Sequence, residues 1–300
     1  MRISVLLVCL LAIVFAGCMP ATSPTPTPAP AELRFYGWLD DFPQSVLDSF
    51  AAETGVRVTY IPYDSPNEGL AAVRAGEVAD VMVLGNGSIL NAAAEGLIRP
   101  IDIRGVDNFA NIALSFRDLV YDPGNQYSIP RNWGTTGIVY RTDLVQEPIT
   151  SWNALWDARY AGKVTTWETP RSIIGAALRT LGHPINTEDP AHLAAARERV
   201  LALRGQITTI INNSQTLSDG LASGAFVMAV GGVNDALNEA GDPRIAYVLP
   251  QEGTMLWGDN LVIPSTSANP EMALRFIDFT LRPDISAQMI AHNRYATPVE

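Results

Sequence analysis

Two hydrophobic periods alternate along the chain, one typical of strands and one typical of helices. Short apolar or alternating runs predict three strands early in the body, at 33–36, 56–61 and 80–84. Apolar positions three and four residues apart predict helices after these strands, at 43–54, 67–75 and 88–95. Gly55 and Gly96 follow two of these helices, a position where glycine commonly ends a helix.

The same alternation resumes beyond a polar and aromatic passage at 127–140. Strands are expected at 163–166, 207–211, 226–230 and 245–249. Helices are expected at 152–159, 170–181, 191–203, 214–223, 272–281 and 283–292. Because strands separated by helices of this length form βαβ units, the chain is predicted to be α/β, with mostly parallel sheets and right-handed crossovers.

Two lobes are expected, because 127–140 resembles a passage between domains and the strand at 261–263 could return to the first lobe. The first lobe is expected to comprise 32–134 and about 261–283, and the second 135–260 and about 284–300. More than one connection between lobes would leave a cleft that opens and closes by hinge motion.

Residues 1–17 have the features of an export signal, with a positive start and an apolar run short for a membrane span. The run ends in small residues before Cys18, which resembles a bacterial lipoprotein signal with Cys18 as the lipidated residue. Phe15 stands where leucine is usual, so a plain cleaved secretory signal is the alternative. Residues 18–31, rich in proline and threonine, are expected to form an extended tether of roughly 40 Å.

Cysteine content and charge narrow the possible chemistry. The two cysteines are Cys9 and Cys18, so the folded body contains no disulfide and no thiolate metal site. A formal net charge of −11 argues against nucleic acid as a partner and is compatible with a cationic ligand.

The stretch Trp257-Gly258-Asp259 is the leading candidate for ligand chemistry. In an extended segment, residues two apart point to the same side, so the indole and the carboxylate could address one ligand. An organic ammonium ion suits both groups, through cation–π attraction and a charge-assisted hydrogen bond. Trp38 with Asp40 and Asp41 forms a similar group after the first strand. The alternative is that the tryptophans are core residues and the aspartates accept hydrogen bonds in turns or helix caps.

Several motifs, taken in order, resemble those of one family. They are Phe35-Tyr36-Gly37-Trp38, Phe50–Val56, Tyr127-Ser128-Ile129-Pro130, Trp133-Gly134-Thr135-Thr136, Thr150–Trp156, Trp257-Gly258-Asp259 and Tyr295-Ala296-Thr297-Pro298. The family is that of the periplasmic polyamine-binding components of ABC importers, the spermidine/putrescine-binding proteins. The resemblance runs from about Leu33 to Pro298 and implies a two-lobe periplasmic-binding-protein fold, type II-like, with a ligand cleft between the lobes.

The resemblance also implies roles for individual residues. Trp38, Asp40, Trp257, Asp259 and Tyr295 match positions that contact the polyamine in this family. Such members usually continue beyond the position of Glu300, so the chain is expected to be a shortened form or a fragment.

Other positions depart from the family's pattern. Gly85 and Gly87 stand where a serine and an aromatic residue are usual. The family's acidic pair falls on Thr169 and Ser172, with Glu168 one position out of register. The stacking tryptophan falls on Val230, and Asp235 lies near but out of register. Glu168, Thr169, Ser172, Asp235 and Gly85 therefore remain secondary candidates, and the pocket is expected to be wider, with fewer carboxylates.

The resulting hypothesis is a membrane-tethered, monomeric binding protein that captures a polyamine-like cation and delivers it to an ABC permease, without a cofactor or a metal. Arg131 and Arg171 raise an alternative ligand with a carboxylate, such as an amino acid, and a quaternary amine is a further alternative. A lipoprotein that senses its ligand is also compatible. An enzyme is disfavoured, because His183, His192 and His292 lack metal-ligand spacing and no nucleophile or phosphate-binding motif is present.

Overall fold

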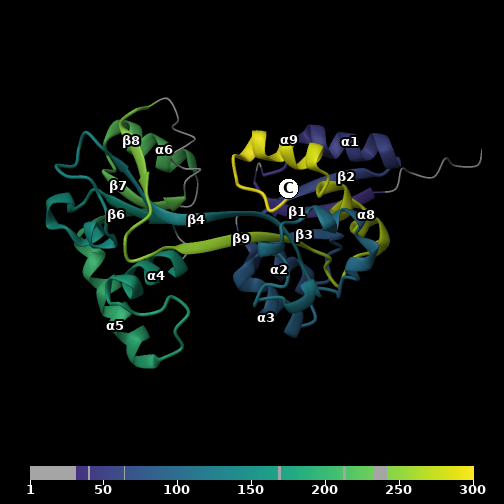
Figure 1. The fold of residues 1–300 in the computed structure, drawn as a ribbon, viewed down its shortest axis with the longest axis horizontal. Coiled ribbons are helices and arrows are strands. Elements are labelled where there is room, and N and C mark those ends of the chain that lie inside the picture. The colour runs from purple at the N-terminus through teal and green to yellow at the C-terminus, as the bar shows by residue number, and fades with distance from the viewer. Residues whose placement is uncertain (1–31, 40, 64, 168–169, 212–213, 233–241) are drawn as a thin grey trace, which may run out of the picture.

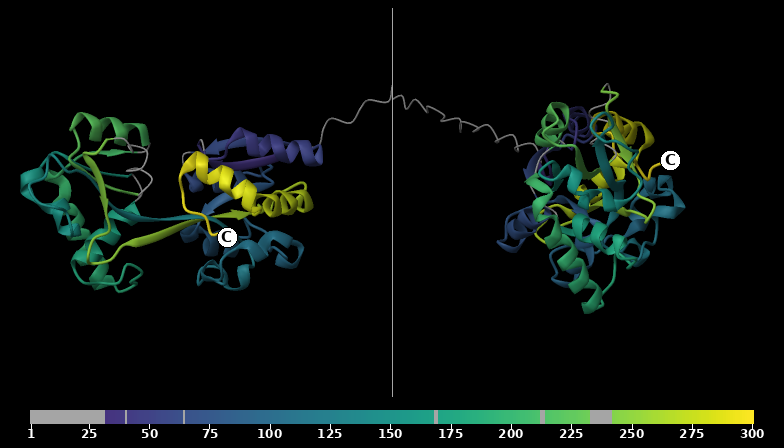
Figure 2. Two further views of the ribbon diagram at one scale, coloured as in Figure 1. Left: turned by 45° about the horizontal axis from the view of Figure 1, so that its top comes forward. Right: turned by 90° about the vertical axis from the view of Figure 1, so that its left-hand side faces the viewer.

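The computed structural model describes residues 32–300 except 40, 64, 168–169, 212–213 and 233–241. Two lobes lie at the two ends of the long axis, and two long strands, β4 (Ile129–Arg141) and β9 (Met255–Val262), run between them (Figure 1). The prediction of two α/β lobes joined by more than one crossing strand is confirmed. Figure 2 shows from two further directions that helices cover the sheet in both lobes.

The first lobe follows the predicted strand–helix order closely. Its strands are β1 (Glu32–Trp38), β2 (Arg57–Tyr63) and β3 (Val81–Gly85). Its helices are α1 (Gln44–Thr54), α2 (Pro66–Arg74), α3 (Ile89–Ala94), α8 (Pro270–Thr280) and α9 (Pro283–Asn293). Short 3₁₀ turns are η1 (Asn86–Ser88), η2 (Ile103–Gly105), η3 (Asp107–Asn111), η4 (Leu114–Phe116) and η5 (Pro123–Asn125).

The second lobe contains the remaining elements. Its strands are β5 (Val164–Trp167), β6 (Ile207–Ile211), β7 (Met228–Gly232) and β8 (Ile245–Val248). Its helices are α4 (Pro170–Thr180), α5 (Pro190–Leu201) and α6 (Ser214–Ser223), with 3₁₀ turn η8 (Ala202–Gly205). The single helix predicted at 152–159 is wrong: two 3₁₀ turns, η6 (Trp152–Trp156) and η7 (Ala158–Tyr160), replace it.

Local sequence explains where several helices begin and end. Ser65 caps α2 by accepting a hydrogen bond from the Glu68 amide, and Pro66 follows at the first helical position. Asn269 caps α8 in the same way through the Met272 amide. Gly55 ends α1 with a φ of 73°, the left-handed conformation that favours glycine.

One continuous sheet passes through both lobes in the order β2-β1-β3-β9-β4-β7-β5-β6, with β8 also paired to β4. β1 pairs parallel with β2 and β3, and β5 pairs parallel with β6 and β7, as predicted for strands separated by helices. β7 and β8 pair antiparallel with β4, which the prediction of mostly parallel sheets did not anticipate. β9 pairs antiparallel with β3 and with β4, so the crossing strands belong to the sheet of each lobe. The hinge is therefore hydrogen-bonded to both bodies that it connects.

Each lobe has its own hydrophobic core. In the first lobe, Phe276 packs edge to face against Phe35 and Phe50, at centroid distances of 5.3 and 5.0 Å. In the second lobe, the fully buried Trp152 packs with Met228 and Val230. Separate cores are what allow the lobes to move as bodies about β4 and β9.

The assignment of residues 284–300 to the second lobe is wrong. Ile285 and Met289 of α9 lie in the same buried cluster as Phe50 and Phe276 of the first lobe. The segment after α9 also stays there, because Val299 bridges to Ile112. The amphipathic pattern identified the helix correctly but does not specify which core receives its apolar face.

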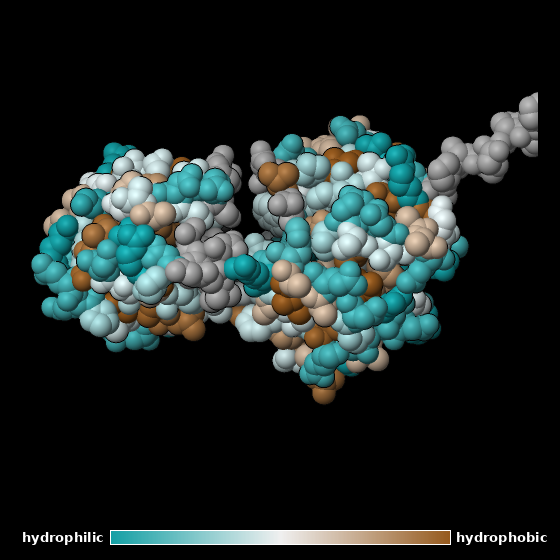
Figure 3. Space-filling view, turned by 90° about the horizontal axis from the view of Figure 1, so that it is seen from above, coloured by the Kyte–Doolittle hydropathy of each residue, from teal (hydrophilic) through white to brown (hydrophobic). Residues whose placement is uncertain are grey.

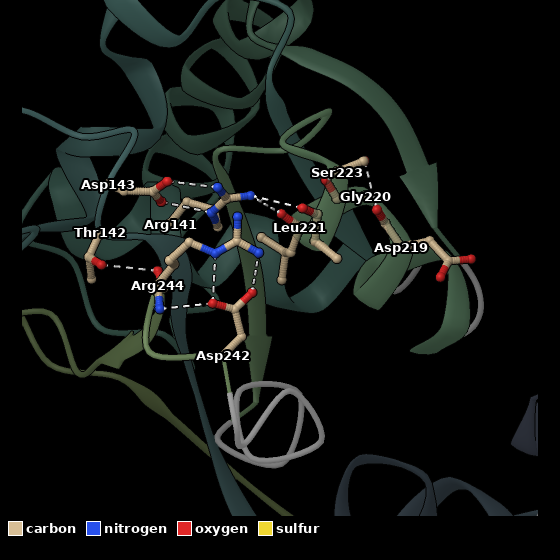
Figure 4. A network of polar contacts seen from close by, with 10 residues as sticks. Arg141, Thr142, Asp143, Asp219, Gly220, Leu221, Ser223, Asp242 and Arg244 are labelled. Atoms are coloured by element: carbon tan, nitrogen blue, oxygen red, sulfur yellow. Dashed lines mark hydrogen bonds and ion pairs between the residues drawn. The ribbon is translucent and has the colours of Figure 1, made fainter.

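A polar network ties together three elements at the outer end of the second lobe (Figure 4). The guanidinium of Arg141, at the end of β4, donates to the Leu221 carbonyl at 2.6 Å and the Ala222 carbonyl at 3.1 Å, in the last turn of α6. It also makes a two-bond ion pair with Asp143 at 2.8 Å. A cation at the C-terminus of a helix is favourable, because carbonyls there lack partners within the helix.

Replacing Arg141 should destabilise this lobe. The Arg141 side chain is 5% exposed, so Arg141→Ala leaves the buried Leu221 carbonyl without this donor and should lower the free energy of unfolding by roughly 3 kcal/mol. Arg104→Ala is the matched control, because the Arg104–Asp102 pair is exposed, and should change it by less than about 0.5 kcal/mol. Urea denaturation measures both values, and equal effects of the two substitutions would refute the structural role of Arg141.

Candidate functional site

The register of the two crossing strands determines which side chains meet at the cleft. Trp257 pairs with Gly134, and Asp259 pairs with Asn132. Because directly paired residues point to the same face of a sheet, these side chains share one face of the hinge. The prediction that Trp257 and Asp259 point to the same side is therefore confirmed.

The indole of Trp257 lies across β4 because Gly134 leaves room for it. A Cβ atom at Gly134 would come within 2.3 Å of the indole carbon Cζ2 of Trp257. The indole also meets Tyr295 edge to face, with ring centroids 5.2 Å apart. Trp257 and Tyr295, the two predicted aromatic contacts from distant parts of the chain, thus form one aromatic wall.

The carboxylate of Asp259 is buried, with 9% of the residue exposed, and is bound by neutral donors. The indole N–H of Trp38 hydrogen-bonds to it, and the Asn132 amide, in the orientation that satisfies its neighbours, donates to Oδ2 at 3.2 Å. Gly85 lies opposite, where a Cβ atom would be 3.8 Å from Oδ1. Trp38 is itself fixed by an edge contact with the Tyr63 ring at 5.2 Å.

Beside this carboxylate lies a buried ion pair between Arg131 and Asp41. The guanidinium donates two hydrogen bonds to the Asp41 carboxylate, at 2.5 and 2.8 Å, and both side chains are at most 3% exposed. Its carbon Cζ lies 4.3 Å from the centre of the Phe42 ring. Asn293 at the end of α9 donates to Asp41 at 3.1 Å. Arg131 is therefore committed within the protein, and the hypothesis that it binds a ligand carboxylate is wrong.

Burial is the main reason that the pKa of Asp259 rises to about 7, and the nearby charge of Asp41 raises this pKa further. Arg131 and the hydrogen bonds from Trp38 and Asn132 oppose the rise without cancelling it. Since Arg131 already neutralises Asp41, Asp259 is the group that a cation entering this face of the hinge would stabilise in its charged form.

The structure describes only some of the predicted site residues. Asp40, Glu168, Thr169 and Asp235 lie outside the described residues, as does the predicted lipidation site Cys18. Ser172 lies in the first turn of α4, at the edge of the second lobe. Trp38, Gly85, Trp257, Asp259 and Tyr295 are brought together at the hinge.

A separate hollow of about 630 Å³ lies on the opposite face of the hinge. Its walls include Trp133, Thr135, Tyr247, Leu249 and Ala296, and none of its lining residues is charged. Trp133 and Thr135 alternate with Asn132 and Gly134 along β4 and so point away from Asp259. Without a counter-charge, this hollow does not suit a cation, and the site is assigned to the face that carries Asp259.

Two functional features escaped prediction from the sequence. Asn132 was not a candidate, although it lies directly across from Asp259 and donates a hydrogen bond to it. The pairing of Arg131 with Asp41 joins residues 90 positions apart. The available signal was charge balance, since a buried aspartate after β1 requires a cation nearby.

Two lobes with separate cores, joined by paired strands and carrying aromatic and acidic groups at the hinge, define a two-lobed solute-binding protein. The model of the bacterial extracellular solute-binding proteins matches residues 45–299, and the chain belongs to this family. Among the described residues, no helix has the length and apolar character needed to cross a membrane.

Relatives with similar sequences are named for polyamine binding. The chain is 33% identical over 271 residues to the spermidine/putrescine-binding periplasmic protein of Escherichia coli K12. The alignment covers 89% of this chain and 77% of that protein. It is 32% identical to the putrescine-binding periplasmic protein SpuD of Pseudomonas aeruginosa, over 86% of this chain and 75% of that protein.

Solved structures agree with this membership. The spermidine/putrescine ABC transporter substrate-binding protein PotD of Streptococcus pneumoniae superposes with a TM-score of 0.79 at 29% identity, covering 90% of this chain and 83% of that one. The TpPotD lipoprotein of Treponema pallidum gives a TM-score of 0.82 at 26% identity, covering 87% and 84%.

The raised pKa of Asp259 should leave a signature in stability against pH. Between the ordinary pKa of 3.8 and the folded-state value of about 7, the unfolded chain has lost the proton that the folded chain keeps. This group therefore makes stability fall as pH rises through that window, with a limiting slope of about 1.4 kcal/mol per pH unit. Above the window the difference is constant.

Asp259→Asn should remove this contribution while retaining the shape of the side chain. The free energy of unfolding of each protein is measured by urea denaturation from about pH 4.5 to 6.5. As pH rises, the value for the wild type should fall progressively relative to the value for the variant. Parallel pH profiles would contradict a raised pKa at Asp259.

Proposed function

We propose that this protein is the substrate-binding component of an ABC importer and that it captures a polyamine such as putrescine or spermidine. The observation that carries the proposal is the state of Asp259. It is a buried carboxylate held by two neutral donors and in no ion pair with a described residue, while its neighbour Asp41 is neutralised by Arg131. The site thus lacks one positive charge, which an ammonium group supplies.

The ligand's ammonium group would donate to Asp259 and stack against the aromatic wall of Trp257 and Tyr295. A charge-assisted hydrogen bond contributes roughly 1.5 to 3 kcal/mol, and a cation–π contact roughly 0.5 to 2 kcal/mol. Because Asp259 has a pKa of about 7, a bound cation also shifts it fully to its charged form. Methylene groups of the ligand then gain by burial as the lobes approach.

Closure delivers the solute to the membrane partner. The two lobes present a furrow between them when viewed from above (Figure 3). A ligand that contacts both lobes favours the closed form by its greater affinity for that form. The relatives named for spermidine and putrescine are periplasmic binding proteins, which supports a protein that binds the solute and passes it to a permease.

Binding rather than catalysis fits the site best. Its charged groups are one ion pair and one carboxylate, and among the described residues no cluster of three or more histidine, cysteine or acidic side chains could hold a metal ion. A quaternary amine could satisfy the aromatic wall but cannot donate the hydrogen bond that Asp259 accepts. A signalling role would use the same closure and would differ only in the partner protein that binds the closed form.

An extracytoplasmic location with a lipid anchor at Cys18 completes the proposal. The relatives include periplasmic proteins and one lipoprotein, TpPotD of Treponema pallidum, which supports export with anchoring. Expression in a bacterium fed labelled palmitate should label the protein, and Cys18→Ser should abolish the label and release the protein from membranes. Equal membrane association of the two proteins without label would reject the anchor.

Titration of the purified protein with putrescine and spermidine, followed by heat and by tryptophan fluorescence, tests the ligand. Saturable binding near micromolar affinity is expected, corresponding to about 8 kcal/mol. Asp259→Asn should weaken it roughly tenfold to a hundredfold, because the charge-assisted bond is lost. Trp257→Ala should weaken it by up to about thirtyfold, and Trp257→Phe less, because a ring face remains.

Asp107→Asn provides the matched control, since Asp107 is exposed on the first lobe and should leave affinity unchanged. A folded protein that ignores both polyamines but binds an amino acid or a quaternary amine in the same titration would redirect the assignment to that class. Unaltered polyamine affinity in Asp259→Asn would place the ligand elsewhere.

A further inference from the structure

Arg171 reaches from the second lobe to the first. It lies in the first turn of α4, yet its Nη1 atom is 3.2 Å from where a Cβ atom at Gly87 would stand, and its Cζ atom 3.7 Å from that point. Gly87 belongs to η1, the turn that follows β3 of the first lobe. The guanidinium therefore packs on the first-lobe turn at a point where any side chain would meet it.

The backbone of Gly87 does not require glycine. Eight other glycines in the described chain have positive φ, but Gly87 does not, so its conformation is open to any residue. The space that a side chain would occupy is limited by Arg171. A Cβ atom at Gly87 would require the exposed guanidinium of Arg171 to move by a few tenths of an ångström, so the two lobes are in contact at this position.

The location of Arg171 is unfavourable for its own helix. A cation in the first turn faces the positive end of the helix dipole, and the first turn of α4 has no acidic residue. Among the described residues, the hydrogen-bond partner of Arg171 is the Asn186 side chain at the long distance of 3.5 Å, and no carboxylate forms an ion pair with it. Within the described part of the chain, neither α4 nor an ion pair explains this arginine.

The same turn region also borders the ligand-binding carboxylate. Gly85, two residues before Gly87, lies opposite Asp259, so a Cβ atom there would be 3.8 Å from Oδ1. One short segment, 85–87, is thus touched by Asp259 from the hinge and by Arg171 from the second lobe. Movement of the second lobe and occupancy of the site act on the same piece of backbone.

We propose that Arg171 is a positioning residue that sets the closing equilibrium of the two lobes by packing its guanidinium on Gly87 across the mouth of the cleft. The contact exists only when the lobes are close, so it stabilises the closed arrangement over the open one. Removing it shifts the population toward open forms and lowers the apparent affinity for any ligand that needs closure. The proposal does not depend on which ligand binds.

Distance measurements between lobes test the proposal without a ligand. Spin labels at Asn91→Cys in α3 and Ala195→Cys in α5, both exposed, report the separation in a background with Cys9→Ser and Cys18→Ser. Arg171→Ala should move the distance distribution to longer and broader values, and Arg171→Lys should lie between it and the wild type. Gly87→Leu should act like Arg171→Ala, because its side chain occupies the space of the guanidinium.

Arg204→Ala is the matched control. Arg204 is an exposed arginine of η8 in the second lobe and forms no ion pair with a described residue. It should leave the distances unchanged, and all variants should unfold at the denaturant concentration of the wild type to within experimental error. Wild-type distances in both Arg171→Ala and Gly87→Leu would overturn the proposal.

Kinetics separate this inference from the ligand assignment. If a polyamine binds, Arg171→Ala should weaken it roughly threefold to thirtyfold through faster dissociation, with the association rate little changed. If no polyamine binds the wild type but the distances still shift, the ligand assignment fails and the cross-lobe contact stands. A slower association rate with unchanged dissociation and unchanged distances would instead assign Arg171 to electrostatic steering and refute the contact.

Discussion

The antiparallel pairing of β4 with β9 is the constraint on which the rest of the molecule depends. These strands are hydrogen-bonded to each other across the hinge and to the sheets of both lobes, so they fix the lobes' connection and the register of the site together. In this register Asn132 faces Asp259 and Gly134 receives the indole of Trp257. A shift of one residue would turn both ligand-side groups to the opposite face, where the hollow lined by Trp133 has no charge.

Charge balance at the hinge connects this geometry to chemistry. Two buried aspartates and one buried arginine lie within one hydrogen-bonded group, in which Asn132 joins Arg131 to Asp259. The arginine is bound to Asp41 with two short hydrogen bonds, which leaves Asp259 without a positive partner among the described residues. Burial, together with the nearby charge of Asp41, therefore raises the pKa of Asp259 to about 7. A buried carboxylate maintained in this state is costly for folding and useful for binding, because an incoming cation removes the penalty.

Much of the fold could be predicted from the sequence, because strand and helix periods are local signals. The helices 44–54 and 283–293 lie within one residue of their predicted bounds, whereas the strand expected at 261–263 begins earlier and spans Met255–Val262. What could not be predicted depends on partners distant in sequence. The apolar face of α9 identifies a helix but not its core, and the pairing of Arg131 with Asp41 depends on how the segment after β1 meets β4, from which β3 and β9 separate β1 in the sheet. The prediction that Trp38, Trp257, Asp259 and Tyr295 act together is supported by their proximity, and their role in binding stays a proposal.

The central claim is that Asp259 receives the ligand's ammonium group and gives up its proton when it does so. Calorimetric titration at about pH 6.5, in two buffers that differ in ionisation enthalpy, counts the protons released on binding. With a pKa of about 7, roughly three-quarters of Asp259 is protonated at that pH, so binding should release most of one proton, and Asp259→Asn should release none. Tight binding with the same heat in both buffers would contradict the account, because it would mean that the cation is neutralised without Asp259.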